Sequence, residues 1–332
     1  MRKMKFITLG ILSLIFLGLI SFSKPEVGEV EKWEMPEVQF PEDNPYSIES
    51  VELGGTLFSE RLFSQDTSIS CQSCHMPHMA LTDQDKVGEG VFGRKVTRNT
   101  PTLNNIGLHP YLMRDGKFAT LEDQVLGPLR DHREFNIEND ELLERLKSVS
   151  YLDEMSQAAY DSELTIEIIQ KAMANFERML ISKDSPFDAF MNGDKTAISA
   201  SAQNGYKLFK SDRLNCIQCH GGFDFTDYSF QNNGTYKTYI DSGRALITKN
   251  KEDIGKFKVP SLRNLDFTFP YMHNGSFQTL EEVILHYERG GAGSENQSPL
   301  IKGFKLTDNE RRDLLAFLSS LTEKRYIEMN ED

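Results

Sequence analysis

The sequence contains only four cysteines and one tryptophan, and it has no long apolar run beyond residue 22. All four cysteines belong to two identical patterns, at residues 71–75 and 216–220, so none is left for a disulfide, a separate zinc site or a lipid anchor. Basic residues are outnumbered, with 37 Lys and Arg against 50 Asp and Glu, and the formal net charge of −13 disfavours a nucleic-acid partner. No segment shows the sustained two-residue alternation typical of half-buried strands.

The two cysteine patterns are Cys-x-x-Cys-His, the attachment signature of c-type haem. In such a site two thioether bonds hold the porphyrin and the adjacent histidine binds the iron. The alternatives are two redox dithiols or one four-cysteine metal site, but a zinc site does not need a histidine directly after each pair. The sequence therefore predicts two covalent haems, bound by Cys71, Cys74 and His75 in the first motif, and by Cys216, Cys219 and His220 in the second.

The one long apolar run lies at the N-terminus. Arg2, Lys3 and Lys5 precede an apolar stretch at residues 6–22, and this order is typical of a secretory signal peptide, here residues 1–23, with cleavage near Ser23. The alternative is an uncleaved membrane anchor, because the run is close to spanning length. Either interpretation puts the rest of the chain outside the cytoplasm and predicts a periplasmic protein.

The remaining chain is predicted to be mostly α, with long loops. Residues 24–45 are rich in Glu and Pro and favour an extended arm or linker. The haem motifs divide the rest of the chain into residues 46–184 and 185–332, with a break before Pro186. Apolar residues between Leu164 and Leu180 recur at helical spacing, and Thr307 and Glu310 form a capping box before another apolar stripe.

Several further segments accompany the haem motifs in a specific order: Thr97-Arg-Asn-Thr-Pro-Thr102, Met113-Arg-Asp-Gly116, Lys258-Val-Pro-Ser-Leu-Arg-Asn264 and Pro270-Tyr-Met-His-Asn-Gly275. With them the chain resembles the bacterial dihaem cytochrome c peroxidase and MauG family from about residue 46 to 321. The resemblance implies two fused cytochrome c-like haem domains. It also implies that the N-terminal haem reacts with hydrogen peroxide. The C-terminal haem would accept electrons from a small donor protein, a cytochrome c or a cupredoxin. The resemblance is also compatible with a homodimer.

The second iron needs a sixth ligand, and Tyr287 is the candidate. Leu280, Val283, Ile284 and Tyr287 stand at i, i+3, i+4 and i+7 and share one face of a helix that begins near Thr279. The resemblance agrees, since the MauG branch has a tyrosine here where typical peroxidases have a methionine. The alternatives are that Tyr287 is a buried core residue and that His286 or a methionine binds. An anionic phenolate favours ferric iron and should lower the potential of this haem.

The first haem is predicted to have an open side. Family peroxidases often place a displaceable histidine before the Arg-Asn-x-Pro motif, but the loop at residues 86–93 contains none, and Glu89 stands about where that ligand would be. The resting ferric haem would then react with peroxide without prior reduction. His78, His109 and His132 are other candidate ligands, though each fits a polar surface or supporting role better.

Peroxide cleavage needs a base that moves a proton from one oxygen to the other. By resemblance, Glu134 matches the family's acid-base glutamate and Gln124, ten residues earlier, matches a glutamine of the same pocket. Gln124 shares a helical face with Leu121 and Val125, so it should face inward. For Glu134 the alternative is a solvated charge in an acidic segment.

The resemblance to the family also bears on an aromatic residue between the haems and on a calcium ion between the domains. The family's tryptophan between the haems, in Trp-Asp-Gly, is replaced by Arg114, and the only tryptophan, Trp33, lies in the arm. Electrons must then use another route, for which Tyr111 and Tyr271 are the aromatic candidates. The family also binds calcium between its domains, and Asn99 with the backbone carbonyls of Thr268 and Pro270 matches that site.

These observations predict a periplasmic dihaem peroxidase that reduces hydrogen peroxide to water. The first alternative is a MauG-like enzyme that uses peroxide to oxidise a protein or an organic substrate, which Tyr287 favours and the missing tryptophan disfavours. The second is a dihaem electron carrier without turnover, which Glu134 and an open first haem disfavour.

Overall fold

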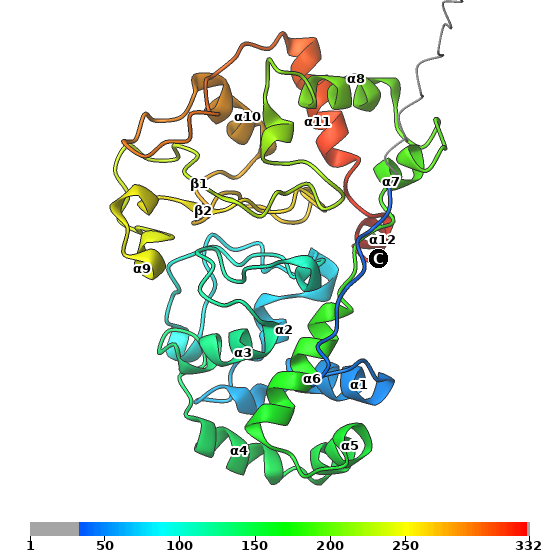
Figure 1. Cartoon of the computed structure of the whole chain (residues 1–332), viewed down its shortest axis with the longest axis vertical. Coiled ribbons are helices and arrows are strands. Elements are labelled where there is room, and N and C mark those ends of the chain that lie inside the picture. Colours follow the sequence, from blue (N-terminus) through cyan, green and yellow to red (C-terminus); the bar gives the residue numbers. More distant parts are fainter. Residues whose placement is uncertain (1–32, 331–332) are drawn as a thin grey trace, which may run out of the picture. The chain divides into compact units, whose positions relative to one another are not determined.

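The computed structural model describes residues 33–330, and the predicted signal peptide with its cleavage site lies outside them. Within the described part, the chain is mostly helical with long loops, and its only sheet is one short antiparallel pair (Figure 1). The helices are α1 (Ile48–Ser59), α2 (Cys71–Cys74), α3 (Leu121–Arg130), α4 (Asn139–Lys147), α5 (Ser150–Tyr160), α6 (Ile166–Arg178), α7 (Pro186–Met191), α8 (Ala200–Phe209), α9 (Ala245–Thr248), α10 (Leu280–Arg289), α11 (Asp308–Ser319) and α12 (Lys324–Glu328), and the strands are β1 (Phe230–Gln231) and β2 (Phe257–Lys258).

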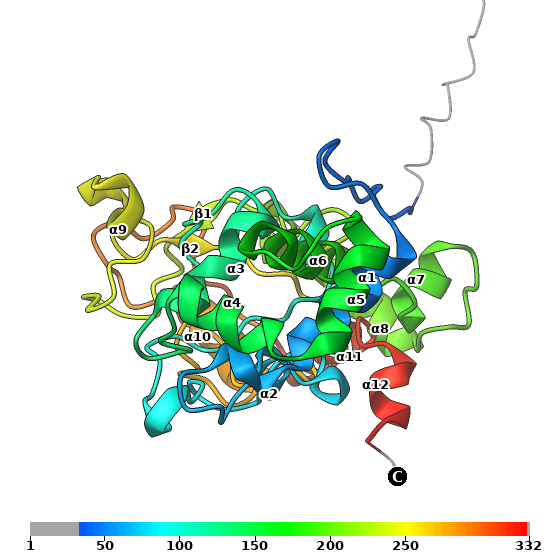
Figure 2. The same cartoon turned by 90° about the horizontal axis from the view of Figure 1, so that it is seen from below.

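Two separate hydrophobic cores divide the described chain. The first is built from residues between Leu53 and Leu180, on helices α1 to α6 and the loops between them, and the second from residues between Phe187 and Leu321, mainly on α8, α10 and α11. Figure 2 shows α1, α3, α5 and α6 gathered around the first core. The fold is therefore two helical halves joined end to end, and each half contains one Cys-x-x-Cys-His motif.

Each half is held by one close crossing of its first and last long helices. In the first half α1 crosses α6, and a Cβ placed on Gly54 would lie 2.1 Å from the carbonyl oxygen of Ala172. In the second half α8 crosses α11 in the same way, and a Cβ on Gly205 would lie 1.9 Å from the carbonyl oxygen of Asp313. Both distances are far below contact, so only glycine allows the two backbones to approach this closely.

The predicted helix starts are found where the sequence placed them. Thr307 caps α11 with Glu310, and Thr279 caps α10 with Glu282; in each case both hydrogen bonds of the capping box are formed. The segment with helical spacing near residues 164–180 forms α6, which begins after its cap, Thr165. Each of these signals depends on residues within one turn of each other, which explains why sequence alone was sufficient.

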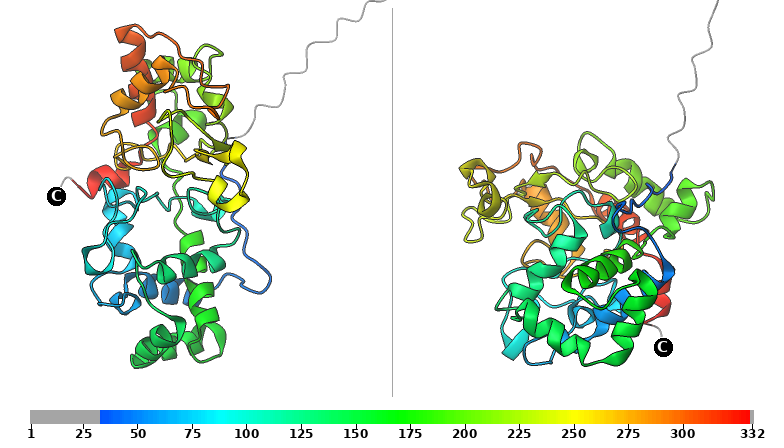
Figure 3. Two further views of the ribbon diagram at one scale, coloured as in Figure 1. Left: turned by 90° about the vertical axis from the view of Figure 1, so that its left-hand side faces the viewer. Right: turned by 60° about the horizontal axis from the view of Figure 1, so that its bottom comes forward.

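The described part of the arm is extended but attached to both halves (Figure 3). Trp33 packs its ring on Phe187 and Phe225 of the second core and donates a 2.7 Å hydrogen bond to Asp188. Asn44 is buried in the first half and donates to Glu122 at 2.7 Å. The arm is thus part of the packed structure and not a free linker over these residues.

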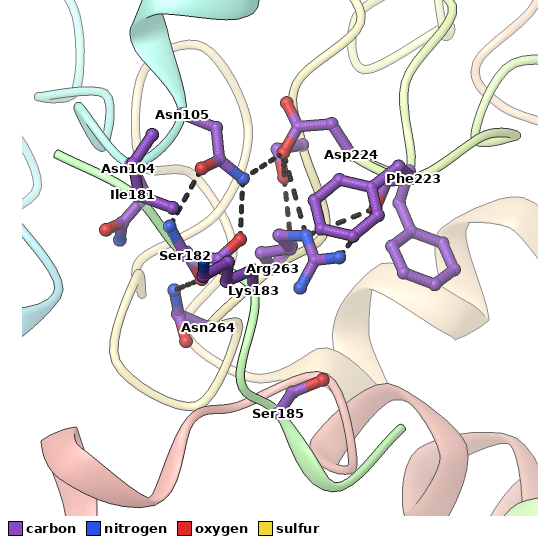
Figure 4. Close-up of polar contacts among 12 residues, drawn as sticks. Asn104, Asn105, Ile181, Ser182, Lys183, Ser185, Phe223, Asp224, Arg263 and Asn264 are labelled. Carbon is purple, nitrogen blue, oxygen red and sulfur yellow. Dashed lines mark hydrogen bonds and ion pairs between the residues drawn. The ribbon is translucent and has the colours of Figure 1, made fainter. Parts of the chain in front are cut away.

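Buried polar contacts join the two halves (Figure 4). Asn105 of the first half donates to Asp224 of the second at 2.9 Å and to the carbonyl of Ser182 at 2.8 Å. Within the second half, Arg263 is 1% exposed, makes a bidentate ion pair with Asp188 at 2.8 and 2.9 Å and lies 3.8 Å from the same Asp224. Because each of these buried groups has a partner, the hydrogen bond between Asn105 and Asp224 can join the two halves without leaving an unpaired charge.

Candidate functional site: two haem cavities

The first Cys-x-x-Cys-His motif lines a cavity of about 1010 Å³. Cys71 and Cys74 lie on α2, and His75 follows at its C-terminal end. The Nδ1 atom of His75 donates to the carbonyl oxygen of Leu81 at 3.0 Å, so Nε2 is the nitrogen left for iron. Burial lowers the pKa of His75, which keeps the imidazole neutral, as an iron ligand must be.

The second motif lines a separate cavity of about 350 Å³. Cys216 and Cys219 lie in and just after a 3₁₀ turn, and His220 donates from Nδ1 to the carbonyl oxygen of Phe225 at 2.9 Å. Burial again lowers the pKa of the histidine. The second half therefore repeats the arrangement of the first, with the same nitrogen fixed by a backbone carbonyl.

The thiols fit haem attachment better than the alternative metal or redox sites. The two pairs line different cavities, so they cannot form one four-cysteine site. No group of three or more His, Cys, Asp or Glu residues suited to a metal ion occurs in residues 33–330. Burial raises the pKa of Cys74 and Cys216 to about 12, which disfavours the thiolate that dithiol redox chemistry requires.

Glu134 and Gln124 both line the first haem cavity, as the sequence predicted. Gln124 lies on α3 and its amide donates to the sulfur of Met113 at 3.7 Å. Burial, and then the negative charge of Asp131, raise the pKa of Glu134 to about 7, against the opposing effects of Arg133 and Lys117. A carboxyl group with a pKa near neutrality exchanges a proton readily, which is the property that a general acid-base residue needs.

The loop at residues 86–93 packs against the backbone of Arg133 and Glu134. Val91 donates its backbone N–H to the carbonyl oxygen of Glu134 at 2.9 Å, and a Cβ on Gly90 would lie 1.9 Å from the carbonyl oxygen of Arg133. Glu89 of the same loop lines the cavity but is about half exposed and paired with Lys95 at 2.8 Å. The loop thus contacts the backbone on which the acid-base candidate, Glu134, is carried.

The histidine candidates for the first iron lie elsewhere. His78 and His132 are exposed and do not line the first cavity, and His109 lines the second cavity, where it contacts Asp224 at 3.1 Å. A histidine that sequence reasoning missed, His273, does line the first cavity as well as the second. Its ring is stacked on Phe257 at 4.0 Å, and burial lowers its pKa to about 4. The sequence did contain a sign of its position, because Met-His-Asn-Gly at residues 272–275 repeats the pattern of Met-Arg-Asp-Gly at residues 113–116.

Tyr287 lines the second cavity together with Leu280, Val283 and Ile284, so the predicted stripe faces the haem site. Its hydroxyl accepts a hydrogen bond of 3.4 Å from Asn233. His286 is buried outside the cavity and donates from Nε2 to the backbone carbonyl of Asn233 at 2.9 Å, which removes that nitrogen as a ligand. Met272 also lines the cavity and receives a 3.1 Å contact from Asn233. Tyr287 and Met272 are thus the two candidates that remain.

The three residues predicted to bind calcium, Asn99, Thr268 and Pro270, all line the second cavity. Asn99 also lines the first cavity. Both oxygen atoms of Asn99, however, already accept hydrogen bonds from Arg114, the side-chain oxygen at 2.6 Å and the carbonyl oxygen at 2.9 Å.

The two aromatic candidates for the electron route lie in different places. Tyr271 lines the second cavity, whereas Tyr111 is exposed and lines neither cavity.

Sequence reasoning also missed Glu177 of α6. Its side chain lines the first cavity, it is 5% exposed, and its Oε2 atom has no hydrogen-bond partner. Burial raises its pKa to about 8, so the carboxyl group is mostly protonated at neutral pH. No local pattern signalled it, because Glu177 lies beside Arg178, whose guanidinium pairs instead with Glu122.

Two haem cavities, each with its own attachment motif and a fixed proximal histidine, define a dihaem c-type cytochrome. Comparison with known proteins gives the family. Residues 48–196 match the family description "Di-haem cytochrome c peroxidase", and residues 202–322 match "Cytochrome c". The chain is 34% identical to the methylamine utilization protein MauG of Methylophilus methylotrophus over 88% of each chain. It is also 34% identical to the cytochrome c peroxidase Ccp of Escherichia coli strain K12, over 86% of this chain and 61% of the relative.

A solved structure agrees with the sequence relatives. A MauG-like protein associated with microbial copper homeostasis superposes with a TM-score of 0.84 at 32% identity, covering 90% of this chain and 96% of the other. The chain therefore belongs to the dihaem cytochrome c peroxidase and MauG family, and it has two cytochrome c-like halves that hold two haem c groups.

Proposed function

We propose that this protein is a periplasmic peroxidase that reduces hydrogen peroxide to water with two electrons from a small redox protein. The observation that carries the proposal is Glu134, a carboxyl group with a pKa of about 7 in the cavity of the first haem motif. The relatives named cytochrome c peroxidase support the same reaction. The overall change consumes one peroxide, two electrons and two protons and yields two waters.

The chain's own residues would supply the proton transfer. As a carboxylate, Glu134 would take a proton from one oxygen of hydrogen peroxide and deliver it to the other oxygen, which would leave as water. Gln124 lines the same cavity and can donate a hydrogen bond to the bound peroxide. The haem, when bound, supplies the iron that receives peroxide and the electrons that reduce it.

We assign the two roles to the two halves. Residues 46–184 would form the peroxidatic domain, with His75 as the proximal ligand. Residues 185–332 would form the electron-accepting domain, with His220 and Tyr287 as iron ligands. Electrons would enter from a cytochrome c or a cupredoxin. Secretion through residues 1–23 would place the protein in the periplasm. No helix in residues 33–330 is both long and apolar enough to cross a membrane.

The second candidate function is MauG-like oxidation of a protein or organic substrate. The position of Tyr287 in the second cavity and the MauG relative favour it. The residue at the family's tryptophan position is Arg114, which has no ring π system to share oxidising equivalents between the haems. This difference makes peroxide reduction the better supported function.

Steady-state turnover separates the candidates. Holoenzyme would be mixed with hydrogen peroxide and either a reduced small cytochrome c or a reduced cupredoxin, with donor oxidation and peroxide loss followed together. A peroxidase oxidises two one-electron donors for each peroxide consumed and releases no oxygen. Peroxide loss that instead requires an organic or protein substrate would favour the MauG-like function. No peroxide loss with any donor would leave only the electron carrier and would overturn the proposal.

A further inference from the structure

A small set of residues lines both haem cavities and so occupies the space that separates them. Among the residues that the structure describes, the shared lining consists of Asn99, Thr100, Pro101, Ile106, Met113, Arg114 and His273. The set contains no carboxylate, and burial keeps His273 neutral at pH 7. Arg114 is therefore the one member of this shared lining with a permanent charge.

The guanidinium of Arg114 is held by Asn99. Nε donates to the backbone carbonyl of Asn99 at 2.9 Å and Nη2 donates to its side-chain oxygen at 2.6 Å. Asn99 is itself 5% exposed and fixed from two sides, because its N–H donates to the carbonyl of His273 at 3.0 Å and its amide nitrogen donates to that of Asp85 at 3.1 Å. The cation is thus positioned by a rigid, buried acceptor.

An interdomain calcium ion bound by Asn99, Thr268 and Pro270 would need the side-chain oxygen of Asn99, which already accepts from Arg114. Calcium takes six to eight oxygen ligands at about 2.3–2.6 Å, so an ion on Asn99 would lie against the guanidinium. Two cations that share the same acceptor atom repel each other strongly in a site of low dielectric constant. The contacts of Arg114 therefore exclude calcium from Asn99.

Arg114 forms no ion pair within residues 33–330, and the only carboxylate that raises its pKa is that of Asp83. By contrast, the neighbouring Arg98 is paired with Asp115 and Asp241, each at 2.7 Å. Burial and the positive charge of Arg98 lower the pKa of Arg114 to about 10, which still leaves it charged at neutral pH. A cation removed from water needs a counter-charge, and each haem carries two carboxylates.

We propose that Arg114 is the resident cation between the two haems, occupying the side-chain oxygen of Asn99 that calcium would use and balancing haem carboxylate charge. A fixed positive charge beside both cavities stabilises the reduced, less positive state of each iron. Arg114 is then a positioning and potential-setting residue for both haems, in the place where the family has a tryptophan.

The first test is calcium dependence of the wild-type holoenzyme. Metal analysis of the holoenzyme before chelation should find well under one calcium per chain, and treatment with a calcium chelator should change neither the haem optical spectrum nor the two midpoint potentials. A calcium ion whose removal alters the haem spectrum or either potential would overturn the proposal.

The second test is redox titration of variants, followed spectroscopically haem by haem. In Arg114→Gln the equilibrium constant for reduction of each haem should fall by about tenfold or more, which is ~59 mV for a one-electron couple. Arg114→Lys, which keeps the charge, should recover most of that loss. Unchanged potentials in Arg114→Gln, or a shift confined to one haem, would contradict a cation shared by both.

Arg244→Gln is the matched control. Arg244 also bridges the halves, donating to the carbonyl oxygens of Asp115 and Gly116 at 2.9 and 2.8 Å, but it lines neither cavity. The Arg244→Gln substitution removes contacts between the two halves without removing a charge from either cavity. Both potentials should therefore stay close to wild type, and a loss as large as that in Arg114→Gln would assign the effect to domain docking and overturn the proposal.

Discussion

Replacement of Glu134 by glutamine tests the proposed chemistry directly. Glutamine keeps the size of the side chain but cannot accept the peroxide proton. A positioned acid-base group contributes about 10²–10⁴-fold to a rate, so peroxide turnover should fall by that factor, equivalent to about 3–5 kcal/mol in the activation barrier. Reduction of the second haem by an artificial donor should hardly change, because Glu134 does not line that cavity.

The pH profile gives a sharper form of the same test. Because the pKa of Glu134 is raised to about 7, the carboxylate that acts as base is lost as pH falls through 7. Wild-type turnover should be half-maximal near pH 7 and about 100-fold lower at pH 5, two units below the pKa. Asp131 contributes to the raised pKa, so Asp131→Asn should move the midpoint to lower pH. In Glu134→Gln this acid limb should disappear.

The assay is initial peroxide consumption with a reduced donor at saturating concentration, measured from pH 5 to 9. Glu138→Gln makes the same chemical change four residues later, at an exposed site that does not line the cavity, and should leave both rate and profile intact. The reasoning is refuted if Glu134→Gln retains turnover within a few-fold of wild type. It is also refuted if the ferric enzyme is entirely six-coordinate low-spin and reacts with peroxide only after partial reduction, a result that would point to His273 as a ligand.

The haem sites support three further predictions. Mass spectrometry of the mature chain should show two haem additions, and one or none would contradict the assignment of both motifs. Tyr287→Phe should change the low-spin haem spectrum and raise the potential of the second haem, because loss of an anionic ligand disfavours ferric iron; an unchanged spectrum would favour Met272. Glu177 has a pKa raised from 4.5 to about 8, so the folded state binds this proton more tightly than the unfolded chain does. Its contribution to stability is therefore fully present below about pH 4.5 and is lost as pH rises to about 8. Glu177→Gln should accordingly be more stable than wild type at pH 9, with a difference that shrinks toward pH 5 in thermal unfolding, and a difference independent of pH would show that Glu177 is not buried as a neutral acid.

The sequence alone was sufficient for features that depend on residues close together in the chain. The two Cys-x-x-Cys-His motifs, the capping box at Thr307 and the apolar stripe that carries Tyr287 each lie within about two helical turns. Their geometry depends on the helical repeat and on local hydrogen bonds, so it changes little with the surrounding fold. For the same reason the side chain of Tyr287, not that of His286, could be expected to face the second cavity.

Only the tertiary structure decided which polar groups lose contact with water and which partners they find. From the sequence, Arg114 is only a replacement of the family's tryptophan that removes an aromatic ring. The structure shows that its guanidinium donates to both oxygen atoms of Asn99. Glu177 is next to Arg178 in sequence, yet it is buried without a partner because Arg178 turns to Glu122, more than fifty residues away in the chain. Burial and charge pairing are set by segments distant in sequence, and they fix the pKa of Glu134 and the surroundings of Arg114.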